Sequence, residues 1–244
     1  MKRILSYTGL LIGLIIILSF VENKPITGTK ILEKMHNRFA GKWYKTFTFT
    51  QKTESYKNDS LVKTATWYEA IVFPDYFRIS FGEIKDGNAA IFIRDSSFNF
   101  SKGKMVRKGL RGEDLTFLLG GMYFHSLDTV LVKMKREGYD ISKAHESTWN
   151  GKKYYVIGSQ TDDEKQNQLW IDKDKLFVKR FIKYNGKNKE EGLFGDHVKI
   201  GKAWSETSCS FYVNDKLIQK EIYYDYAANK PVDMGLFDPY NFKR

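Results

Sequence analysis

Hydrophobic and polar residues alternate with a period of two over most of the chain, a pattern typical of half-buried β-strands. The clearest stretch is 148–184. It contains Asn150-Gly151, which tolerates the positive backbone angles of a two-residue hairpin turn, and the polar connection Lys173-Asp174-Lys175. The pattern therefore predicts consecutive antiparallel strands, with the apolar runs Tyr154 to Ile157, Gln168 to Asp172 and Leu176 to Tyr184.

The same alternation predicts further strands before and after this stretch. Phe73-Pro74-Asp75 should separate two of them, because proline cannot donate to a sheet ladder. Residues 190–202 are polar and are expected to form a long connection, whereas the apolar tail 231–242 should pack back on the body. The other expected strands are Trp43 to Gln51, two within Leu61 to Gly82, Ala89 to Arg94, Ser97 to Phe100, Ser205 to Val213 and Lys216 to Tyr226, the last pair joined by Asn214-Asp215.

Three segments have helical spacing instead. The first follows a cap at Thr27 or Thr29 and carries Ile31, Leu32, Met35 and Phe39 at helical intervals. The other two are Asp114 to Phe124 and, after a cap at Ser126, Leu127 to Gly138. The predicted fold class is therefore α+β and mostly antiparallel β, with roughly ten strands, an N-terminal helix and a mid-chain helical insertion.

The link between the two later helices, 119–125, is both glycine-containing and very apolar. Two interpretations remain open. It is a mobile cover over a hydrophobic concavity, or it is a buried helix break in which Gly120 and Gly121 permit close packing.

The N-terminus has the pattern of a secretory signal. Lys2 and Arg3 precede an apolar run from about residue 10 to 21, which is short for a membrane span. We expect residues 1–21 to be a signal peptide, either cleaved or retained as an anchor, and 22–244 to be a single domain. No cysteine follows the apolar run, so lipoprotein processing is not expected and the predicted location is the periplasm.

Composition changes this picture in two ways. Aromatic residues make up 16% of the chain, so the rings either fill a β core or partly line a cavity for an apolar ligand. The net charge of +11 would suit nucleic acid, but the lysines are scattered and form no basic helix or stripe. We therefore expect no nucleic-acid partner and a solvated basic surface that favours anionic lipid.

Motifs for catalysis are absent from the sequence. The four histidines lie in separate segments, no H-E-x-x-H or G-x-S-x-G occurs, and Cys209 is the single cysteine. We expect no catalytic residue, no metal and no cofactor, and the chain is not expected to be an enzyme. A hydrolase would need His125 or His197 to meet an acidic partner in a pocket.

Short motifs along the chain resemble those of the periplasmic lipoprotein carriers, the LolA/LolB-like family. They are the helix Ile31 to Phe39 leading into Phe47-Thr48-Phe49-Thr50-Gln51, the strand–proline–strand unit Trp67 to Ile79 with Pro74, the turn Asp86-Gly87, the strand end Leu169-Trp170-Ile171-Asp172, and Phe237-Asp238-Pro239. Phe73 departs from that pattern, because the carriers commonly have a basic residue before the proline that helps to control the lid. That lid mechanism is therefore not carried over.

The resemblance implies an incomplete, half-open β-barrel with the helical insertion as a lid. It also implies a monomer that binds acyl chains of lipoproteins or other lipids in an apolar concavity, and a membrane-bound donor or acceptor protein as partner. The alternative is a non-catalytic envelope-associated protein whose half-barrel is filled by its own helices. The candidate cavity residues are Phe47, Phe49, Trp67, Ile71, Phe77, Ile79, Phe92, Leu118, Met122, Phe124 and Trp170.

Overall fold

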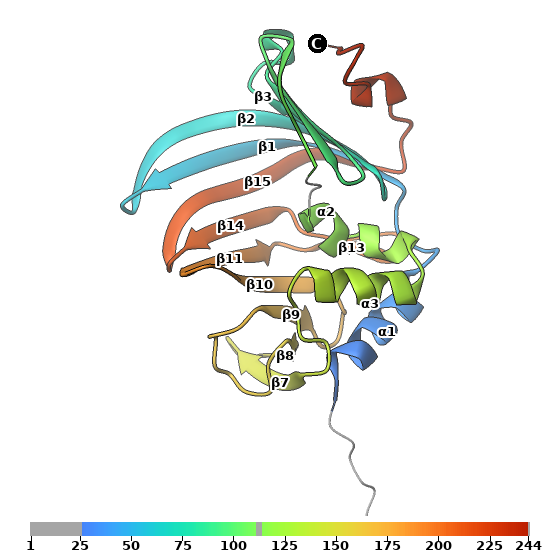
Figure 1. Ribbon diagram of the computed structural model, residues 1–244, viewed down its shortest axis with the longest axis vertical. Coiled ribbons are helices and arrows are strands. Elements are labelled where there is room, and N and C mark those ends of the chain that lie inside the picture. The colour runs from blue at the N-terminus through green and yellow to red at the C-terminus, as the bar shows by residue number, and fades with distance from the viewer. Residues whose placement is uncertain (1–25, 111–113, 244) are drawn as a thin grey trace, which may run out of the picture.

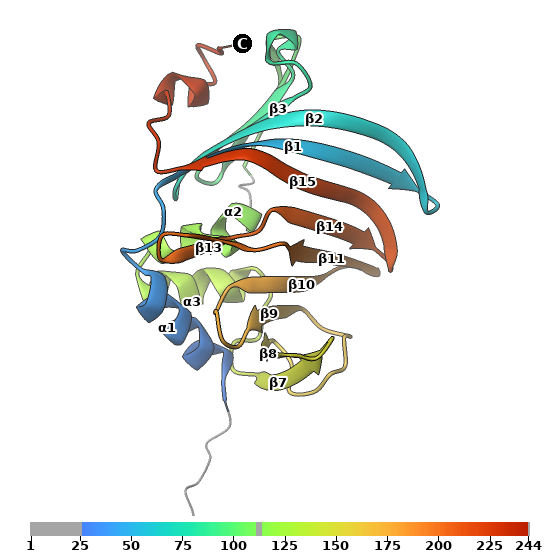
Figure 2. The same cartoon turned by 180° about the vertical axis from the view of Figure 1, so that it is seen from behind.

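A single long antiparallel sheet dominates the computed structural model, which describes residues 26–110 and 114–243 (Figures 1 and 2). The sheet has 13 strands in the order β6-β5-β4-β3-β2-β1-β15-β14-β11-β10-β9-β8-β7. It curves but does not close into a barrel, so β6 and β7 are its edges. The predicted antiparallel β class is confirmed, but the number of strands exceeds the ten expected. The predicted signal peptide, 1–21, lies outside the described residues.

The first half of the sheet is a meander, and β1 then pairs with the last strand, β15. The β1–β2 turn uses Asn58 and Asp59, both with positive φ. The strands of this first half are β1 Thr46–Lys57, β2 Ser60–Val72, β3 Tyr76–Phe81, β4 Ala89–Ile93, β5 Ser96–Ser101 and β6 Lys104–Gly109.

The second half contains the hairpins predicted at Asn150-Gly151 and Asn214-Asp215, and all four turn residues have positive φ. Strands β12 and β13 form a separate two-stranded sheet. The bounds are β7 Ala144–Trp149, β8 Lys152–Ile157, β9 Gln168–Asp172, β10 Val178–Asn185, β11 Asn188–Gly195, β12 Val198–Ile200, β13 Ala203–Ser205, β14 Ser208–Val213 and β15 Lys216–Ala228.

The prediction of a polar connection over 190–202 is wrong, because most of this segment is strand. β11 lies inside the sheet between β10 and β14. Its inner face carries the fully buried Phe194 and also Gly192, where a Cβ would lie 2.2 Å from Phe181 Cε1. Glycine therefore leaves room for the Phe181 ring to cover the strand. Because β11 itself contains few apolar residues, its sequence pattern predicted a polar connection.

The helices lie on one side of the sheet. α1 (Gly28–Phe39) contacts α3 (Leu127–Arg136) and β8, and α2 (Asp114–Leu118) is followed by the short 3₁₀ helix η2 (Gly121–Phe124). Thr27 and Ser126 cap α1 and α3 as predicted, each accepting a hydrogen bond from a backbone N–H three residues on. The remaining 3₁₀ turns are η1 (Ile84–Asp86) and η3 (Met234–Phe237). Among the described residues, none of the helices is long and apolar enough to cross a bilayer.

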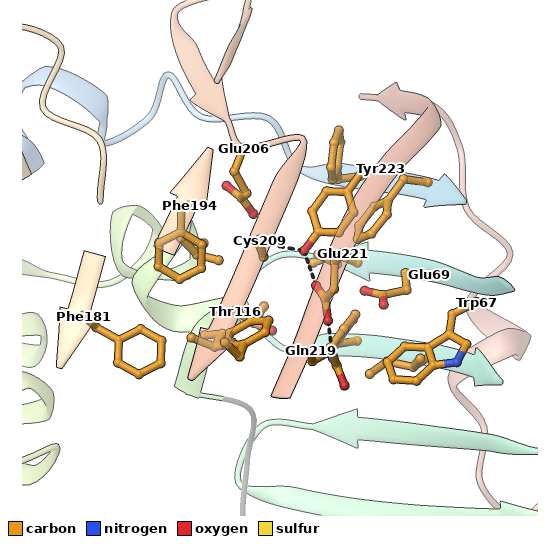
Figure 3. A pocket seen from close by; sticks show the side chains of 18 of the residues that line it. Trp67, Glu69, Thr116, Phe181, Phe194, Glu206, Cys209, Gln219, Glu221 and Tyr223 are labelled. Carbon is orange, nitrogen blue, oxygen red and sulfur yellow. Dashed lines mark hydrogen bonds between the residues drawn. The ribbon is translucent and has the colours of Figure 1, made fainter. Parts of the chain in front are cut away.

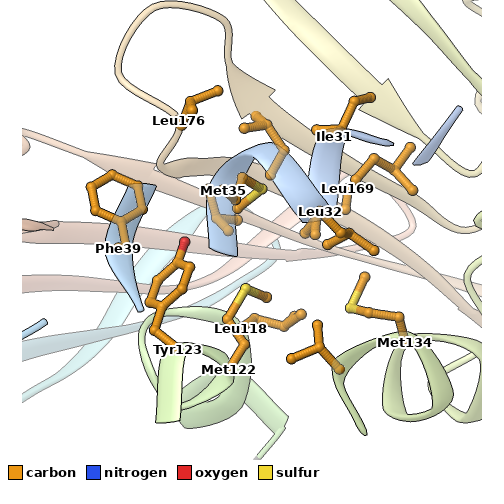
Figure 4. Packing of buried hydrophobic residues seen from close by; sticks show 14 of the residues in the cluster. Ile31, Leu32, Met35, Phe39, Leu118, Met122, Tyr123, Met134, Leu169 and Leu176 are labelled. Atoms are coloured by element: carbon orange, nitrogen blue, oxygen red, sulfur yellow. The ribbon is translucent and has the colours of Figure 1, made fainter. Parts of the chain in front are cut away.

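The apolar stripe of α1 packs between η2 and α3 on one side and strands β9 and β10 on the other (Figure 4). The side chains of this core are almost completely buried, so this part of the concave side is filled by the chain itself. The labelled members are Ile31, Leu32, Met35, Phe39, Leu118, Met122, Tyr123, Met134, Leu169 and Leu176.

The C-terminal tail packs on the opposite, convex face of β2 to β5, as its composition predicts. Phe237 is 2% exposed, and Phe242 stacks on Phe100 with ring centroids 4.1 Å apart. The Arg78 guanidinium donates to the backbone oxygens of Leu236 at 2.9 Å and Lys243 at 2.7 Å. The tail thus closes a second, smaller core.

Replacing Phe237 by alanine should destabilise the fold by about 3 kcal/mol, because a buried ring is lost from this core. The measurement is the free energy of unfolding from urea titration. Tyr240→Ala is the matched control in the same tail, since Tyr240 is 76% exposed. Equal, small losses for both variants would show that the tail is not part of the folded core.

Candidate functional site

A cavity of about 490 Å³ lies between the concave face of the sheet and α2. Its walls come from the inner faces of β1, β2, β3, β10, β11, β14 and β15 (Figure 3). Most of the surface is aromatic or aliphatic. The apolar lining residues are Tyr44, Phe47, Phe49, Trp67, Ile71, Phe73, Phe77, Ile79, Leu115, Leu119, Phe181, Phe194, Phe211, Tyr212, Val213, Ile218 and Tyr223.

Strand alternation and register bring one half of this wall together. Residues directly opposite each other on neighbouring strands share a face, and Phe49 pairs with Glu69, which pairs with Ile79. Ile71 pairs in turn with Phe77. Six of the predicted cavity residues therefore line the same cavity: Phe47, Phe49, Trp67, Ile71, Phe77 and Ile79.

Four other predicted residues lie nearby but not in this wall. Phe92 and Leu118 line an adjoining hollow of about 480 Å³, which shares Phe181 and Phe211 with the cavity. Met122 is 2% exposed and belongs to the core beside α1. Phe124 packs against the same core and stacks on Phe73, with ring centroids 5.6 Å apart.

Trp170 lies on the convex face, away from the cavity. Its neighbours in β9, Leu169 and Ile171, point into the main core, so alternation directs Trp170 outward. There it packs with Tyr154, and the Arg180 guanidinium lies 5.2 Å from its ring. The sequence pattern alone left the concave face of this hairpin undecided, and the structure assigns Leu169 and Ile171 to it.

Sequence reasoning missed most of the opposite wall, which is built by β10, β11, β14 and β15. Phe194 was hidden in the segment expected to be a polar connection. Phe181 and Phe211 lie on strands that the sequence predicted, so period-two spacing could have assigned them to the cavity once the concave face was known. The carboxyl groups in the cavity gave no motif signal at all.

Three of these carboxyls, Glu69, Glu206 and Glu221, lie in the inner wall (Figure 3). Glu221 accepts hydrogen bonds from the Tyr223 hydroxyl at 2.8 Å and from Gln219 Nε2 at 2.5 Å. Burial nevertheless raises the pKa of Glu221 above its ordinary value. Burial also raises the pKa of Glu206 from 4.5 to about 8, and the neighbouring Glu221 adds to the effect.

Cys209 Sγ lies 3.2 Å from the Tyr223 hydroxyl in the same wall. Burial, together with Glu206 and Glu221, raises the pKa of this thiol well above its ordinary value. Because the thiolate is the nucleophile, this shift disfavours a nucleophilic role for Cys209.

The histidines make contacts outside this cavity. His197 stacks on Phe177 with ring centroids 3.6 Å apart, and burial lowers its pKa to about 3. His125 lines a separate polar hollow that also contains Asp75 and Glu137. Within residues 26–110 and 114–243, no group of three or more His, Cys, Asp or Glu side chains is arranged to hold a metal ion.

The fold matches solved structures over most of its length. A DUF1329 family protein from Desulfovibrio piger has a TM-score of 0.61 at 16% identity, covering 86% of this chain and 95% of that one. A LolA superfamily protein from Nitrosomonas europaea has a TM-score of 0.56 at 13% identity, covering 87% and 98%. A domain from Vibrio parahaemolyticus, assigned as an outer membrane lipoprotein-sorting protein, has a TM-score of 0.60 at 12% identity, covering 86% and 96%.

These similarities show that the chain has the LolA-like fold, as the sequence motifs predicted. The evidence for this is structural, because the sequence matches no family model and no curated protein. Identities this low establish the fold and leave the ligand to be argued from the cavity.

Glu206 should make stability depend on pH. Its folded-state pKa, about 8, exceeds its ordinary value of 4.5, so between these two pH values the folded protein binds more protons than the unfolded chain. Stability contributed by this group therefore falls as pH rises through that window. Glu206→Gln should remove the fall, making the variant relatively more stable at pH 9 than at pH 5, by about 4 kcal/mol.

The measurement is urea unfolding of parent and variant at both pH values. Glu54→Gln is the matched control, since Glu54 is a partly exposed acid on the outer face of β1 paired with Lys52 at 2.7 Å, and its pKa is lowered and not raised. If the difference between the Glu206→Gln variant and the parent is the same at pH 5 and pH 9, the raised pKa is wrong.

Proposed function

We propose that the protein is a non-catalytic periplasmic carrier that holds acyl chains of lipids or lipoproteins in the cavity. The observation that carries this proposal is the aromatic and aliphatic lining of a space of about 490 Å³. This volume lies within the range of roughly 300–1,000 Å³ that is usual for small-molecule sites. Each buried methylene of an acyl chain contributes about 0.8 kcal/mol, so binding requires an apolar shape and no reactive group.

Similarity of fold to LolA superfamily proteins, and to a domain assigned to lipoprotein sorting, supports the same proposal. In this proposal residues 1–21 direct export to the periplasm, and 22–244 act as one monomeric carrier domain. A membrane-bound donor or acceptor protein would load or unload the ligand.

The helical insertion would act as the cover of the cavity. Leu115, Thr116 and Leu119 line the cavity from the side of α2, opposite the sheet. The segment that follows is closely packed, since a Cβ on Gly120 would lie 2.4 Å from Trp43 Nε1. We therefore assign any opening movement to α2 and treat the glycine link as a fixed, tightly packed base.

The alternative is a structural protein whose concavity is filled by its own helices. This description fits the half of the concave side where α1, η2 and α3 bury Met35, Phe39 and Met134 completely. It does not fit the other half, where the cavity is open beneath Phe49 and Ile79. The carrier proposal accounts for both halves, with one as scaffold and the other as binding site.

Filling the cavity should abolish ligand binding. Ile79→Trp replaces an aliphatic side chain in the cavity wall by a bulky indole ring. It should lower affinity for the neutral apolar probe N-phenyl-1-naphthylamine at least tenfold. The matched control is Ile222→Trp, because Ile222 lies between the inward-facing Glu221 and Tyr223 and points outward, with 38% exposure.

Fluorescence titration gives the affinities, and native mass spectrometry of protein purified without detergent should detect an acyl species on the parent and the control. Thermal unfolding of both variants checks that they fold. A parent protein that carries no acyl species and binds no probe would refute the carrier proposal.

A further inference from the structure

The charged side chains that line the cavity all have the same sign. Its ionisable groups other than tyrosine and cysteine are all acids, and no lysine, arginine or histidine occurs among the described residues that line it. This contrasts with a chain whose net charge is +11. The acids are Glu69, Glu190, Glu191, Glu206 and Glu221.

Among the described residues, Glu206 and Glu221 lack a counter-charge. Glu191 is paired with Arg180 at 2.6 Å, but neither Glu206 nor Glu221 forms an ion pair within the described part of the chain. Glu221 is 7% exposed, and the groups that donate hydrogen bonds to its two oxygens, the Gln219 amide and the Tyr223 hydroxyl, are both neutral. Buried charges in proteins are normally paired.

Gln51 supplies an independent observation. It lies between the cavity-lining residues Trp67 and Tyr223, to which it is directly paired on β2 and β15, so its side chain is on the cavity face of the sheet. It is 1% exposed, and its Nε2 donates to Thr53 Oγ1 at 2.8 Å. Its Oε1 has no hydrogen-bond partner in the described structure. A buried acceptor without a donor is costly and points to a missing donor.

We propose that the cavity binds an amphiphile whose buried polar end is an organic ammonium group, which Glu206 and Glu221 neutralise and to which Gln51 Oε1 accepts a hydrogen bond. This inference rests on the carrier function proposed above and specifies the chemical class of the ligand. The acyl or alkyl chain occupies the apolar part of the cavity, toward Phe47, Ile71 and Phe77.

The wall favours an organic cation over a metal ion. The acids are not arranged as a metal-binding group in the described structure. Aromatic rings lie beside them instead, with the Phe49 and Tyr223 centroids 4.3 Å apart and Trp67 packed against Phe81. Ring faces attract ammonium groups by cation–π interactions.

Anionic head groups are disfavoured in the same place. A carboxylate or phosphate would meet acids and no cation there. The positive groups that border the wall are already paired with acids, Arg180 with Glu191 at 2.6 Å and Lys183 with Glu137 at 2.9 Å. Arg107 lies in the adjoining hollow. The cavity therefore discriminates by the charge of the ligand's buried end.

Binding should be linked to proton release. Glu206 in the empty protein has a pKa of about 8 and is mostly protonated at neutral pH, whereas a bound cation favours its ionised form. Affinity for a fixed cation should therefore rise with pH up to about 8 and then level off.

The charged or titratable groups that face Glu206 and Glu221 from the packed elements are Glu69 on β2, Cys209 on β14, Tyr223 on β15 and Tyr44 before β1, with Lys179 on β10 beyond Cys209.

Three single-chain probes of equal length test the proposal on the full protein. They are dodecylammonium, a primary ammonium that has N–H donors for Gln51 Oε1 and, like a lysine side chain, stays protonated at both pH values, neutral monolaurin and anionic dodecanoate. Affinities come from displacement of N-phenyl-1-naphthylamine below the micelle concentration, at pH 6 and pH 9. We expect the cation to bind at least tenfold more tightly than monolaurin at pH 9, with a smaller preference at pH 6, and dodecanoate to bind most weakly.

Glu206→Gln and Glu221→Gln should each lower the ratio of cation affinity to monolaurin affinity at least fivefold. Glu54→Gln, on the outer face of β1, should leave both unchanged. Equal affinity of the parent for cation and monolaurin at both pH values would overturn the inference while leaving the carrier function intact. Failure of all three probes to bind would instead contradict the carrier function. Because the parent comparison needs no variant, the test holds even if a substitution prevents folding.

A further arm identifies the source of the ammonium group. Lysophosphatidylethanolamine combines it with a phosphate, whereas dodecylamine does not. Comparable binding of both would support a phospholipid ligand, and binding of dodecylamine alone would support a phosphate-free amphiphile. Failure of both at pH 9, with monolaurin still bound, would overturn the inference.

Discussion

The need to cover the concave face of one long curved sheet determines the rest of the structure. Thirteen strands expose more inner surface than the helices can bury. α1, η2 and α3 complete a dry core against β8, β9 and β10. Among the described helices, the short α2 is the one that lines the face formed by β1, β2 and β15, and a hollow of about 490 Å³ remains beneath it. The cavity therefore follows from the ratio of strand to helix in the sequence.

Much of the fold could be predicted because its signals are local. Hairpin turns at Asn150-Gly151 and Asn214-Asp215, caps at Thr27 and Ser126, and the period-two run through Phe47 and Phe49 each depend on a few neighbouring residues. The same locality explains the error at β11. Gly192 makes room for the Phe181 ring of the neighbouring strand, and this ring buries part of β11. A pattern within β11 alone does not show that contact.

The site was predictable to a smaller extent, for a related reason. Periodicity assigns residues to one of two faces, and the structure places six of the predicted aromatic or aliphatic residues, all on β1 to β3, around one cavity. Periodicity cannot say which face is concave. Trp170 was therefore predicted to line the cavity, but it lies on the convex face. Nor does periodicity show that Glu206 and Glu221 meet in an apolar wall, because that contact joins the β13–β14 link with β15. The polar chemistry of the cavity emerges only from the assembled sheet.

The central claim is that this cavity is a ligand site and not a packing defect. A crystal structure of the protein purified from its native cells without detergent tests it most directly. The account predicts continuous elongated density along Phe47, Ile71 and Phe77, with its polar end beside Glu206 and Glu221. A collapsed cavity in which α2 closes onto Phe49, or one that holds separate water molecules alone, would contradict it.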